Sequence, residues 1–537
     1  MTEIDRRAVL AGAVAAAVAA GTPAARAEPV SGPGFDRLFG AVAVHPEDAR
    51  YEELVVGVNK RWVASPESVR LVGSTEQVLQ VVQEAVSTGK RLSVRSGGHC
   101  YADFVCHPDT DLILDVSGMN RISYDPLRRA FEVQSGAQLG RIYETLYKGW
   151  GVTIPGGACL TVGIGGHASG GGFGLLTRKF GLVADHLEAV EAVVVDRAGR
   201  ARVVTASRSA ADPNNDLWWA ATGGGGGSFG VVTRFWFRSA DATGDDPGRQ
   251  LPAPPKEVLI SSVGVPWSRL DVGTFSTLVR NFTEWHEVNG GVDSPFINVA
   301  GFLLIRQGAA GGVGLFTQVD GTDPAADRLL ADYLAAITRG TALGGPFPSR
   351  RVPWLASTKL VATSNPTLLY DHTLRSAVKT AYLRRSFTDG QLATIHRHMT
   401  RADYSSPGAA ISLNGGAGRL NTVPPAATAS AHRDATFIAL YENFWIDRAE
   451  DAVHLGWLRD IYHETFAATG GYPVPNEQSD GCYINDPDPD ITDPAFNRSG
   501  VPWQTLYWKG NYPRLQQAKA RWDPTDFFRH SQSVRLP

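Results

Sequence analysis

The sequence predicts an α+β protein with two domains. Its 537 residues are too many for one ordinary hydrophobic core, so two domains are the first expectation. Short strand-like and helix-like runs alternate from about Glu67 to Ala240, whereas longer segments of both kinds follow from Pro247 to Gly470. This change of pattern indicates a domain boundary between Ala240 and Pro247.

The N-terminal segment has the layout of a secretory signal. Arg6 and Arg7 precede an apolar run that ends at Ala20, and Ala25 to Ala27 offer a small-residue cleavage site. Paired arginines before a weakly hydrophobic run indicate the twin-arginine route, which carries folded proteins. The alternative is an ordinary disordered tail. We expect a signal peptide over residues 1–27 and an exported protein, because no later stretch has the roughly twenty apolar residues that cross a bilayer.

The first domain begins with a βαβ pattern. The strand-like SVRLVG precedes a helix-like run in which Ser74 is the predicted N-cap and Gln77 occupies the capping-box position. A second strand-like run, RLSVRSGG, follows. Further strand-like runs with glycine at their turns are LILDVSG, AFEVQSG, LEAVEAVVVDRAG and SFGVVTRFWF.

The second domain is predicted to be an antiparallel sheet backed by helices. Strand-like runs are VLISSVGVPW and FINVAGFLLI, and helix-like runs are AADRLLADYLAAITRG, QLATIHRHMTRA and DAVHLGWLRDIYHETFAATGG. The last fifty residues are again helical and aromatic.

The composition excludes some classes of partner. The formal net charge is −3, from 51 basic and 54 acidic residues, so no charge excess indicates binding to nucleic acid or anionic membrane. A small-molecule substrate fits better. The four cysteines are too few for a disulfide scaffold in a chain of this length, so each needs its own explanation.

The stretch GGHCYADFVCH, from Gly97 to His107, allows three interpretations. A zinc site would use His99, Cys100, Cys106 and His107, but their spacing fits no usual ligand pattern. A disulfide between Cys100 and Cys106 is possible in an exported protein. Simple packing of a histidine beside a buried cysteine is the third interpretation.

Two further glycine clusters indicate a large, extended cofactor. Nine glycines lie between Gly156 and Gly174, in PGGACLTVGIGGHASGGGFGLLTRKFG, and five more run from Gly223 to Gly227. Such loops can present several backbone N–H groups to a pyrophosphate. The dinucleotide-binding GxGxxG motif after a strand and the P-loop motif are both missing here.

These segments resemble the flavin oxidases of the vanillyl-alcohol oxidase and berberine bridge enzyme type. The likeness is carried by RSGGH, by GGACLTVGIGGHASGGGFG, by DLWWAATGGGGGSFGVVT, by YIN followed by PDPD, and by NYPRLQQAKARWDP. It extends from about Glu47 to Pro537. Within the family, the sequence is most similar to actinomycete tailoring oxidases of sugars or glycosides.

The resemblance implies a two-domain vanillyl-alcohol oxidase-type flavoprotein fold. The FAD domain would combine residues 47–240 with a C-terminal segment, 475–537, and residues 247–470 would form the substrate domain. His99 matches the histidine joined to the flavin 8α-methyl, and Cys159 matches the cysteine joined to C6. The resemblance therefore implies a bicovalent FAD enzyme without a metal.

The same motifs imply the other contacts of the cofactor. Val162 matches a position where a small side chain accompanies access of oxygen to the flavin, so it points to an oxidase. The remaining predicted cofactor-binding residues are Arg95, Ser96, Gly97, Gly98, Gly163, Gly165, Gly166, His167, Gly170, Gly171, Gly226, Gly230, Val231 and Asn511.

The substrate side departs from the family pattern. Sugar-oxidising relatives place a catalytic tyrosine after Tyr-x-Asn, where this chain has Asp486, and they also carry tyrosines at positions matching Phe173 and Gly416. Asp486 and Tyr483 are the candidate catalytic residues. Strand alternation would put Asp486 on the flavin side and Tyr483 on the other, but NDPDPD also reads as a solvated turn.

The resemblance implies an FAD-dependent oxidase that removes a hydride from an alcohol carbon and reduces O2 to H2O2. A sugar or a glycosylated natural product is the favoured substrate, and no obligate protein partner is expected. One alternative is oxidative cyclisation or dehydrogenation of a polyketide or alkaloid. Another is a flavin-carrying protein that binds a drug and confers resistance.

Overall fold

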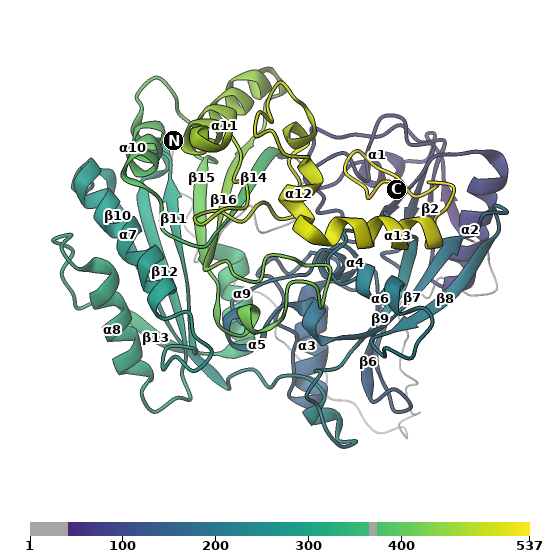
Figure 1. Ribbon diagram of the computed structural model, residues 1–537, viewed down its shortest axis with the longest axis horizontal. Coiled ribbons are helices and arrows are strands. Elements are labelled where there is room, and N and C mark those ends of the chain that lie inside the picture. Colours follow the sequence, from purple (N-terminus) through teal and green to yellow (C-terminus); the bar gives the residue numbers. More distant parts are fainter. Residues whose placement is uncertain (1–40, 365–372) are drawn as a thin grey trace, which may run out of the picture. The chain divides into compact units, whose positions relative to one another are not determined.

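The computed structural model describes residues 41–364 and 373–537, so the predicted signal peptide lies outside the described residues. Three β-sheets are found in this part of the chain, with helices packed around them (Figure 1). No described helix is long and apolar enough to cross a bilayer.

The first sheet contains the predicted βαβ unit. Its strand order is β1-β2-β4-β3, and β2, β4 and β3 run parallel. Ser74 caps the crossover helix α2, because its Oγ accepts a hydrogen bond from the Gln77 backbone N–H at 3.3 Å, as predicted. The elements are β1 (Val42–Val44), α1 (Tyr51–Leu54), β2 (Ser68–Leu71), α2 (Thr75–Thr88), β3 (Leu92–Arg95) and β4 (Leu112–Asp115).

The second sheet is antiparallel and has the order β5-β6-β9-β7-β8. Short helices and glycine loops connect its strands and lie beside the third sheet. The elements are β5 (Ile122–Asp125), β6 (Ala130–Gln134), α3 (Leu139–Trp150), α4 (Ile164–Ser169), α5 (Thr177–Phe180), β7 (Leu187–Val195), β8 (Ala201–Ser207), α6 (Asn215–Ala220) and β9 (Val231–Phe237).

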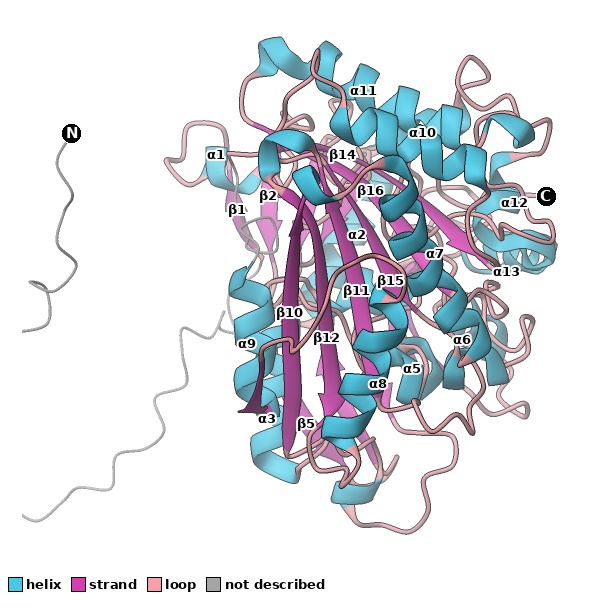
Figure 2. Cartoon of the chain, turned by 90° about the vertical axis from the view of Figure 1, so that its left-hand side faces the viewer, coloured by secondary structure: helices cyan, strands magenta, loops and turns pink. Residues whose placement is uncertain are grey.

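The third sheet has seven antiparallel strands in the order β13-β10-β12-β11-β15-β16-β14. Helices α7, α8, α10 and α11 lie over one face of it (Figure 2), which confirms the predicted antiparallel sheet backed by helices. The elements are β10 (Glu257–Pro266), α7 (Val272–Val288), β11 (Val299–Arg306), β12 (Gly312–Asp320), α8 (Ala326–Thr338), β13 (Ser349–Pro353), α9 (Trp354–Ser364), β14 (Arg375–Leu383), α10 (Asp389–Thr400), β15 (Ala410–Gly415), β16 (Phe437–Trp445) and α11 (Asp451–Thr465).

The other face of this sheet is left for the site. Along β11, Leu303 and Ile305 are fully buried, whereas Phe302, Leu304 and Arg306 alternate with them and are only half-buried. We call the uncovered face the cavity face, and its residues are Ala300, Phe302, Leu304, Arg306, Ser412, Asn414, Leu440 and Glu442.

The C-terminal segment returns to the first half of the chain. It contains α12 (Trp503–Trp508) and α13 (Tyr512–Trp522), and α13 packs against α6 (Figure 1). Asp216 of α6 accepts hydrogen bonds from Arg521 at 3.0 Å and from the Trp522 indole at 3.2 Å. This is the arrangement implied for an α+β flavoprotein whose cofactor domain uses both ends of the chain.

Candidate active site

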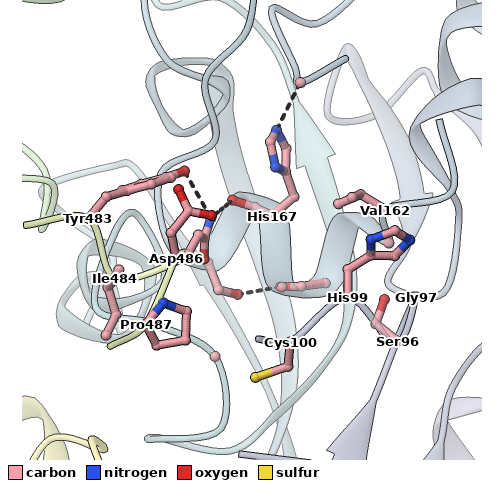
Figure 3. Close-up of a pocket in the computed structure, with 18 of the residues that line it drawn as sticks. Ser96, Gly97, His99, Cys100, Val162, His167, Tyr483, Ile484, Asp486 and Pro487 are labelled. Atoms are coloured by element: carbon pink, nitrogen blue, oxygen red, sulfur yellow. Dashed lines mark hydrogen bonds between the residues drawn. The ribbon is translucent and has the colours of Figure 1, made fainter. Parts of the chain in front are cut away.

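A cavity of about 490 Å³ lies between the glycine loops and the cavity face of the seven-stranded sheet. All three glycine clusters contribute to its wall, and so does the C-terminal segment around Tyr483. Figure 3 places Tyr483 and Asp486 on one side of this pocket and His99 and Val162 on the other. Segments that are far apart in the sequence therefore meet at one site.

Two glycine loops cross at the base of the cavity. A Cβ added to Gly97 would lie 2.2 Å from the Gly163 nitrogen, and one added to Gly163 would lie 2.1 Å from the Ser96 Oγ. Ser96 is held in place, because its hydroxyl donates to the Ser135 carbonyl at 2.6 Å. Only glycine permits such a close approach of two backbones.

This crossing brings the two predicted tether residues together. The Cys159 Sγ lies 4.0 Å from the His99 Nδ1, and both side chains line the cavity. Thr161, which the sequence did not single out, bonds the other ring nitrogen of His99 through its Oγ1 at 2.9 Å. The pKa of Cys159 is raised, chiefly by burial. Two nucleophilic atoms thus face one small region of the cavity.

Most of the predicted cofactor-binding residues line this cavity. An added Cβ at Gly166 or Gly226 would meet no atom within 4 Å, so the backbone there borders open space that a flat ligand can fill. Because the glycine loops border this open space, the residues that line the cavity fit an extended cofactor. The predicted residues that line the cavity are Ser96, Gly97, Gly98, His99, Cys159, Val162, Gly163, Gly165, Gly166, His167, Gly226, Gly230 and Val231.

Four predicted residues do not line this cavity. Arg95 donates to the Leu54 carbonyl at 2.7 Å, and Asn511 donates to the Pro425 carbonyl at 2.8 Å, so both side chains hold backbone segments. Gly170 and Gly171 also lie outside the lining of this cavity. Their contact with the cofactor stays a prediction.

The predicted strand alternation around Tyr483 was wrong. Residues 482–486 form no strand, because the Asp486 N–H closes a turn onto the Tyr483 carbonyl at 3.2 Å just before Pro487. Tyr483 and Asp486 consequently both line the cavity, whereas Cys482 packs against the Tyr462 hydroxyl at 3.6 Å. Asp486 faces the cavity, as expected, but for a different reason.

Tyr483 is held as a protonated phenol. Its oxygen accepts hydrogen bonds from the Gly172 N–H at 3.1 Å and from the Asn485 amide at 2.9 Å. Burial and then the charge of Asp486 raise the pKa of Tyr483 above its usual value. The phenol is therefore suited to positioning a ligand and not to taking a proton at neutral pH.

Asp486 has the properties of a general base. It is half-buried and lines the cavity, and no hydrogen bond or ion pair reaches its carboxylate from the residues that the structure describes. Burial raises its pKa to about 7. A carboxyl group with such a pKa is partly ionised at neutral pH and gains a proton readily.

Glu442 of β16 is a second acidic residue of the cavity that the sequence analysis missed. Burial, and then the charge of Asp486, raise its pKa to about 8. The alternation in TFIALYENFW was the available signal, because it puts Leu440 and Glu442 on one face of a strand.

The structure distinguishes between the alternative interpretations of the GGHCYADFVCH stretch. No disulfide joins Cys100 and Cys106, so that alternative was wrong, and Cys106 is buried in a small core with Val44 and Ile113. His107 approaches Asp103 at 3.6 Å, away from the pair formed by His99 and Cys159. Packing explains Cys106, and the cavity explains His99.

Comparison with known proteins agrees with this geometry. Residues 66–204 match the family described as FAD binding domain, and residues 482–535 match the family described as Berberine and berberine like. The aclacinomycin-N/aclacinomycin-A oxidase of Streptomyces galilaeus is 44% identical over 521 residues, which cover 96% of this chain and 94% of that protein.

Solved structures of other proteins also match this fold. The flavoenzyme CrmK, described as involved in shunt product recycling in caerulomycin biosynthesis, has a TM-score of 0.90 and 47% identity, over 93% of this chain and 100% of that one. The glycopeptide hexose oxidase DBV29, solved with teicoplanin, has a TM-score of 0.88 and 45% identity, over 93% and 99% of the two chains.

The fold, the glycine cradle and these matches define an FAD-dependent oxidoreductase. Within that class, the chain belongs to the berberine bridge enzyme-like family. The resemblance inferred from the sequence motifs is confirmed.

Proposed function

We propose that this protein is an oxidase that removes a hydride from an alcohol carbon of a sugar or a glycosylated natural product. FAD supplies the two-electron redox chemistry, and O2 is the proposed final acceptor, giving H2O2. The relatives support this choice, since one is named an aclacinomycin oxidase and another a glycopeptide hexose oxidase. The chain's own residues bind the substrate, orient it and take its proton.

Asp486 is the observation that carries this proposal. Its carboxylate, which has no partner among the described residues, lines the same cavity as His99 and Cys159, and its pKa of about 7 suits it to accept a hydroxyl proton. Tyr483, fixed by its two hydrogen-bond donors, borders the same space and orients the substrate.

The 4.0 Å separation of the His99 and Cys159 side chains supports bicovalent attachment of FAD. Both atoms lie where one edge of a single ring system can reach them. Val162, which lines the cavity next to this pair, supports access of O2 because its side chain is small.

The test begins with a panel of sugars, amino sugars and glycosides, with detection of peroxide from the purified holoprotein. Asp486→Asn should then slow anaerobic reduction of the flavin about 10²–10⁴-fold, the usual effect of removing a general base. In the unmodified protein, the rate should fall as pH drops below about 7, because Asp486 becomes protonated. A variant within a few-fold of the parent across pH would place the base elsewhere.

Oxidative cyclisation or dehydrogenation of a polyketide or alkaloid is the second candidate, and it is considered because CrmK is described as a flavoenzyme of natural-product biosynthesis. The same screen, extended to polyketides and alkaloids, separates the two candidate functions by the product formed.

We also propose that the protein is exported by the twin-arginine route. Its flavin and its activity should then be recovered from the culture medium, and replacement of Arg6 and Arg7 by lysine should retain them in the cell.

A further inference from the structure

Two carboxyl groups line the cavity and lie close enough to interact electrostatically. Glu442 stands on the cavity face of β16, which is paired on both sides, with β15 and with β14, and so holds a rigid position. Asp486 comes from the turn after Tyr483. Both line the same cavity, and the charge of Asp486 acts on Glu442.

No cation of the described chain pairs with either carboxyl group. Neither Glu442 nor Asp486 takes part in a side-chain hydrogen bond or an ion pair among the described residues. Arg306 also lies on the cavity face, but its guanidinium is turned away. A Cβ added to Gly314 of β12 would lie 3.0 Å from the Arg306 Nη1, and β12 flanks β11 on the side opposite to β15 and β16.

Two other arginines line the cavity, and both bond backbone oxygens; the Arg529 guanidinium donates to the Asp526 carbonyl at 3.2 Å. Arg178 donates to the carbonyls of Gly416 at 3.2 Å and of Phe296 at 3.4 Å, and also to that of Asn289. Its charge is therefore held at backbone oxygens. Among the described residues, no cation therefore forms a hydrogen bond or an ion pair with either acidic group.

An enclosed acidic pair of this kind is costly without a partner. Burial, and then the charge of Asp486, raise the pKa of Glu442 to about 8, although the charge of Arg306 lowers it, and burial raises the pKa of Asp486 to about 7. Tyr101, which also faces the pair, has a raised pKa from burial and from both carboxylates. A cation bound between these groups would favour their ionised forms.

We propose that Glu442 binds a positively charged nitrogen of the substrate, while Asp486 takes the proton of a nearby hydroxyl. The substrate class is then a basic amino alcohol, such as an amino sugar carried on a natural product. The aromatic walls at Tyr101 and Phe302 suit a cation, because the faces of aromatic rings attract positive charge. The hydroxyl part of this inference rests on the proposed oxidase function, whereas the binding of the nitrogen does not.

The test uses the holoprotein and a pair of small probes of equal shape, cyclohexylamine and cyclohexanol. Anaerobic titration followed by the flavin absorbance should show the amine binding about ten- to a hundredfold more tightly than the alcohol, as expected for a charged hydrogen bond. The preference should weaken from about pH 9 to about pH 6, because Glu442 must lose a proton to pair with the amine. Calorimetry in buffers of different ionisation enthalpy should detect that released proton.

Glu442→Gln keeps the shape of the side chain and removes the charge, so it should bring the two probes to within about twofold of each other. Glu477→Gln is the matched control, because Glu477 is exposed and lies outside the cavity, and it should leave the preference unchanged. Should Glu442→Gln fold poorly, Glu442→Met gives the same test.

Equal binding of the two probes to the parent protein would overturn the proposal, and so would a Glu442→Gln variant that still prefers the amine. Tighter binding of D-glucose than of D-glucosamine would instead assign the acidic pair to neutral hydroxyls. None of these results depends on turnover, so a protein that prefers the amine but forms no peroxide would contradict only the oxidase function.

Discussion

Asp486 illustrates how the environment of one residue can compensate for a change of chemistry. A free carboxyl group has a pKa of about 3.9 and a phenol one of about 10, so an exposed aspartate would be a far weaker base than a tyrosinate. Burial in the cavity raises the pKa of Asp486 to about 7. A carboxyl group with a pKa near neutrality can accept a proton at the position where the sequence resemblance implies a tyrosine base.

The two predicted tether residues, His99 and Cys159, lead to the first prediction at this scale. His99→Ala and Cys159→Ala alone should each keep the flavin bound after denaturation through the remaining bond, whereas the double variant should release it. The reason is that the two atoms lie 4.0 Å apart and face the same space. Acid-precipitated protein that stays yellow, with one flavin bridging two peptides in mass spectra, is the expected result. Flavin extracted freely from the parent protein would contradict it.

Val162 leads to the second prediction at the residue scale. The Val162 N–H donates to the Cys159 carbonyl at 3.3 Å, so its side chain is held at the cavity wall beside that predicted tether residue. Val162→Leu adds bulk there and should slow reoxidation of the reduced enzyme by O2 at least about tenfold, with little effect on reduction by substrate. Stopped-flow mixing with air-saturated buffer measures this. Val162→Ala, which adds no bulk, is the control and should reoxidise as fast as the parent.

The sequence could predict the residues of short motifs but not those set by long-range pairing. His99 and Cys159 stand in glycine-rich motifs that identify them by position, and the structure brings them together. Glu442 stands in an ordinary apolar strand. Its role depends on which face of β16 the helices cover, and that depends on pairing with β15 and β14, which both lie more than twenty residues earlier in the chain.

At the scale of elements, local chemistry was the more reliable guide. The cap at Ser74 was predicted because the signal lies within four residues. The segment from Cys482 to Asp486 was predicted as a strand, although the proline after Asp486 favoured the turn that forms. Alternating apolar residues over only five positions are a weak signal for a strand. Here the residues that favour a turn, Asp486 and Pro487, determined the local structure.

The crossing of the glycine loops leads to a prediction for the element. Gly163→Ala would put a Cβ 2.1 Å from the Ser96 Oγ and 2.4 Å from the Gly97 nitrogen, and the backbone of that loop cannot move without displacing His99. We expect a loss of about 1–3 kcal/mol in the free energy of unfolding, the usual cost of overpacking, together with a lower flavin content. Chemical denaturation and the ratio of flavin to protein absorbance measure both.

Gly149→Ala is the matched control for this substitution. Gly149 lies within α3, and an added Cβ there meets nothing within 4 Å. Alanine should stabilise the helix by roughly 0.5–1 kcal/mol and leave the flavin content unchanged. Equal behaviour of the two variants would mean that the crossing tolerates a side chain.

At the scale of the whole molecule, a buried charge cluster joins the seven-stranded sheet to the C-terminal segment. Lys379 of β14 is almost fully buried, and its Nζ lies 2.7 Å from the Asp488 carboxylate and 2.9 Å from that of Asp490. Arg459 of α11 pairs with Asp490 at 2.7 Å. The acidic run after Asn485, which also read as a solvated turn, is therefore an anchor that places Asp486 beside the cavity.

This anchor leads to the last prediction. Lys379→Met removes the cation and leaves Asp488 buried without it, and breaking a buried pair in this way costs about 3–5 kcal/mol of folding free energy. Lys256→Met, at an exposed position, should change stability by less than about 0.5 kcal/mol. The double variant Lys379→Met with Asp488→Asn should recover part of the lost stability, because no uncompensated charge remains at Asp488.

Since the anchor also positions Asp486, Lys379→Met should slow flavin reduction as well as lower the denaturation midpoint. A stable variant with unchanged reduction kinetics would show that the turn holds Asp486 in place without the charge cluster.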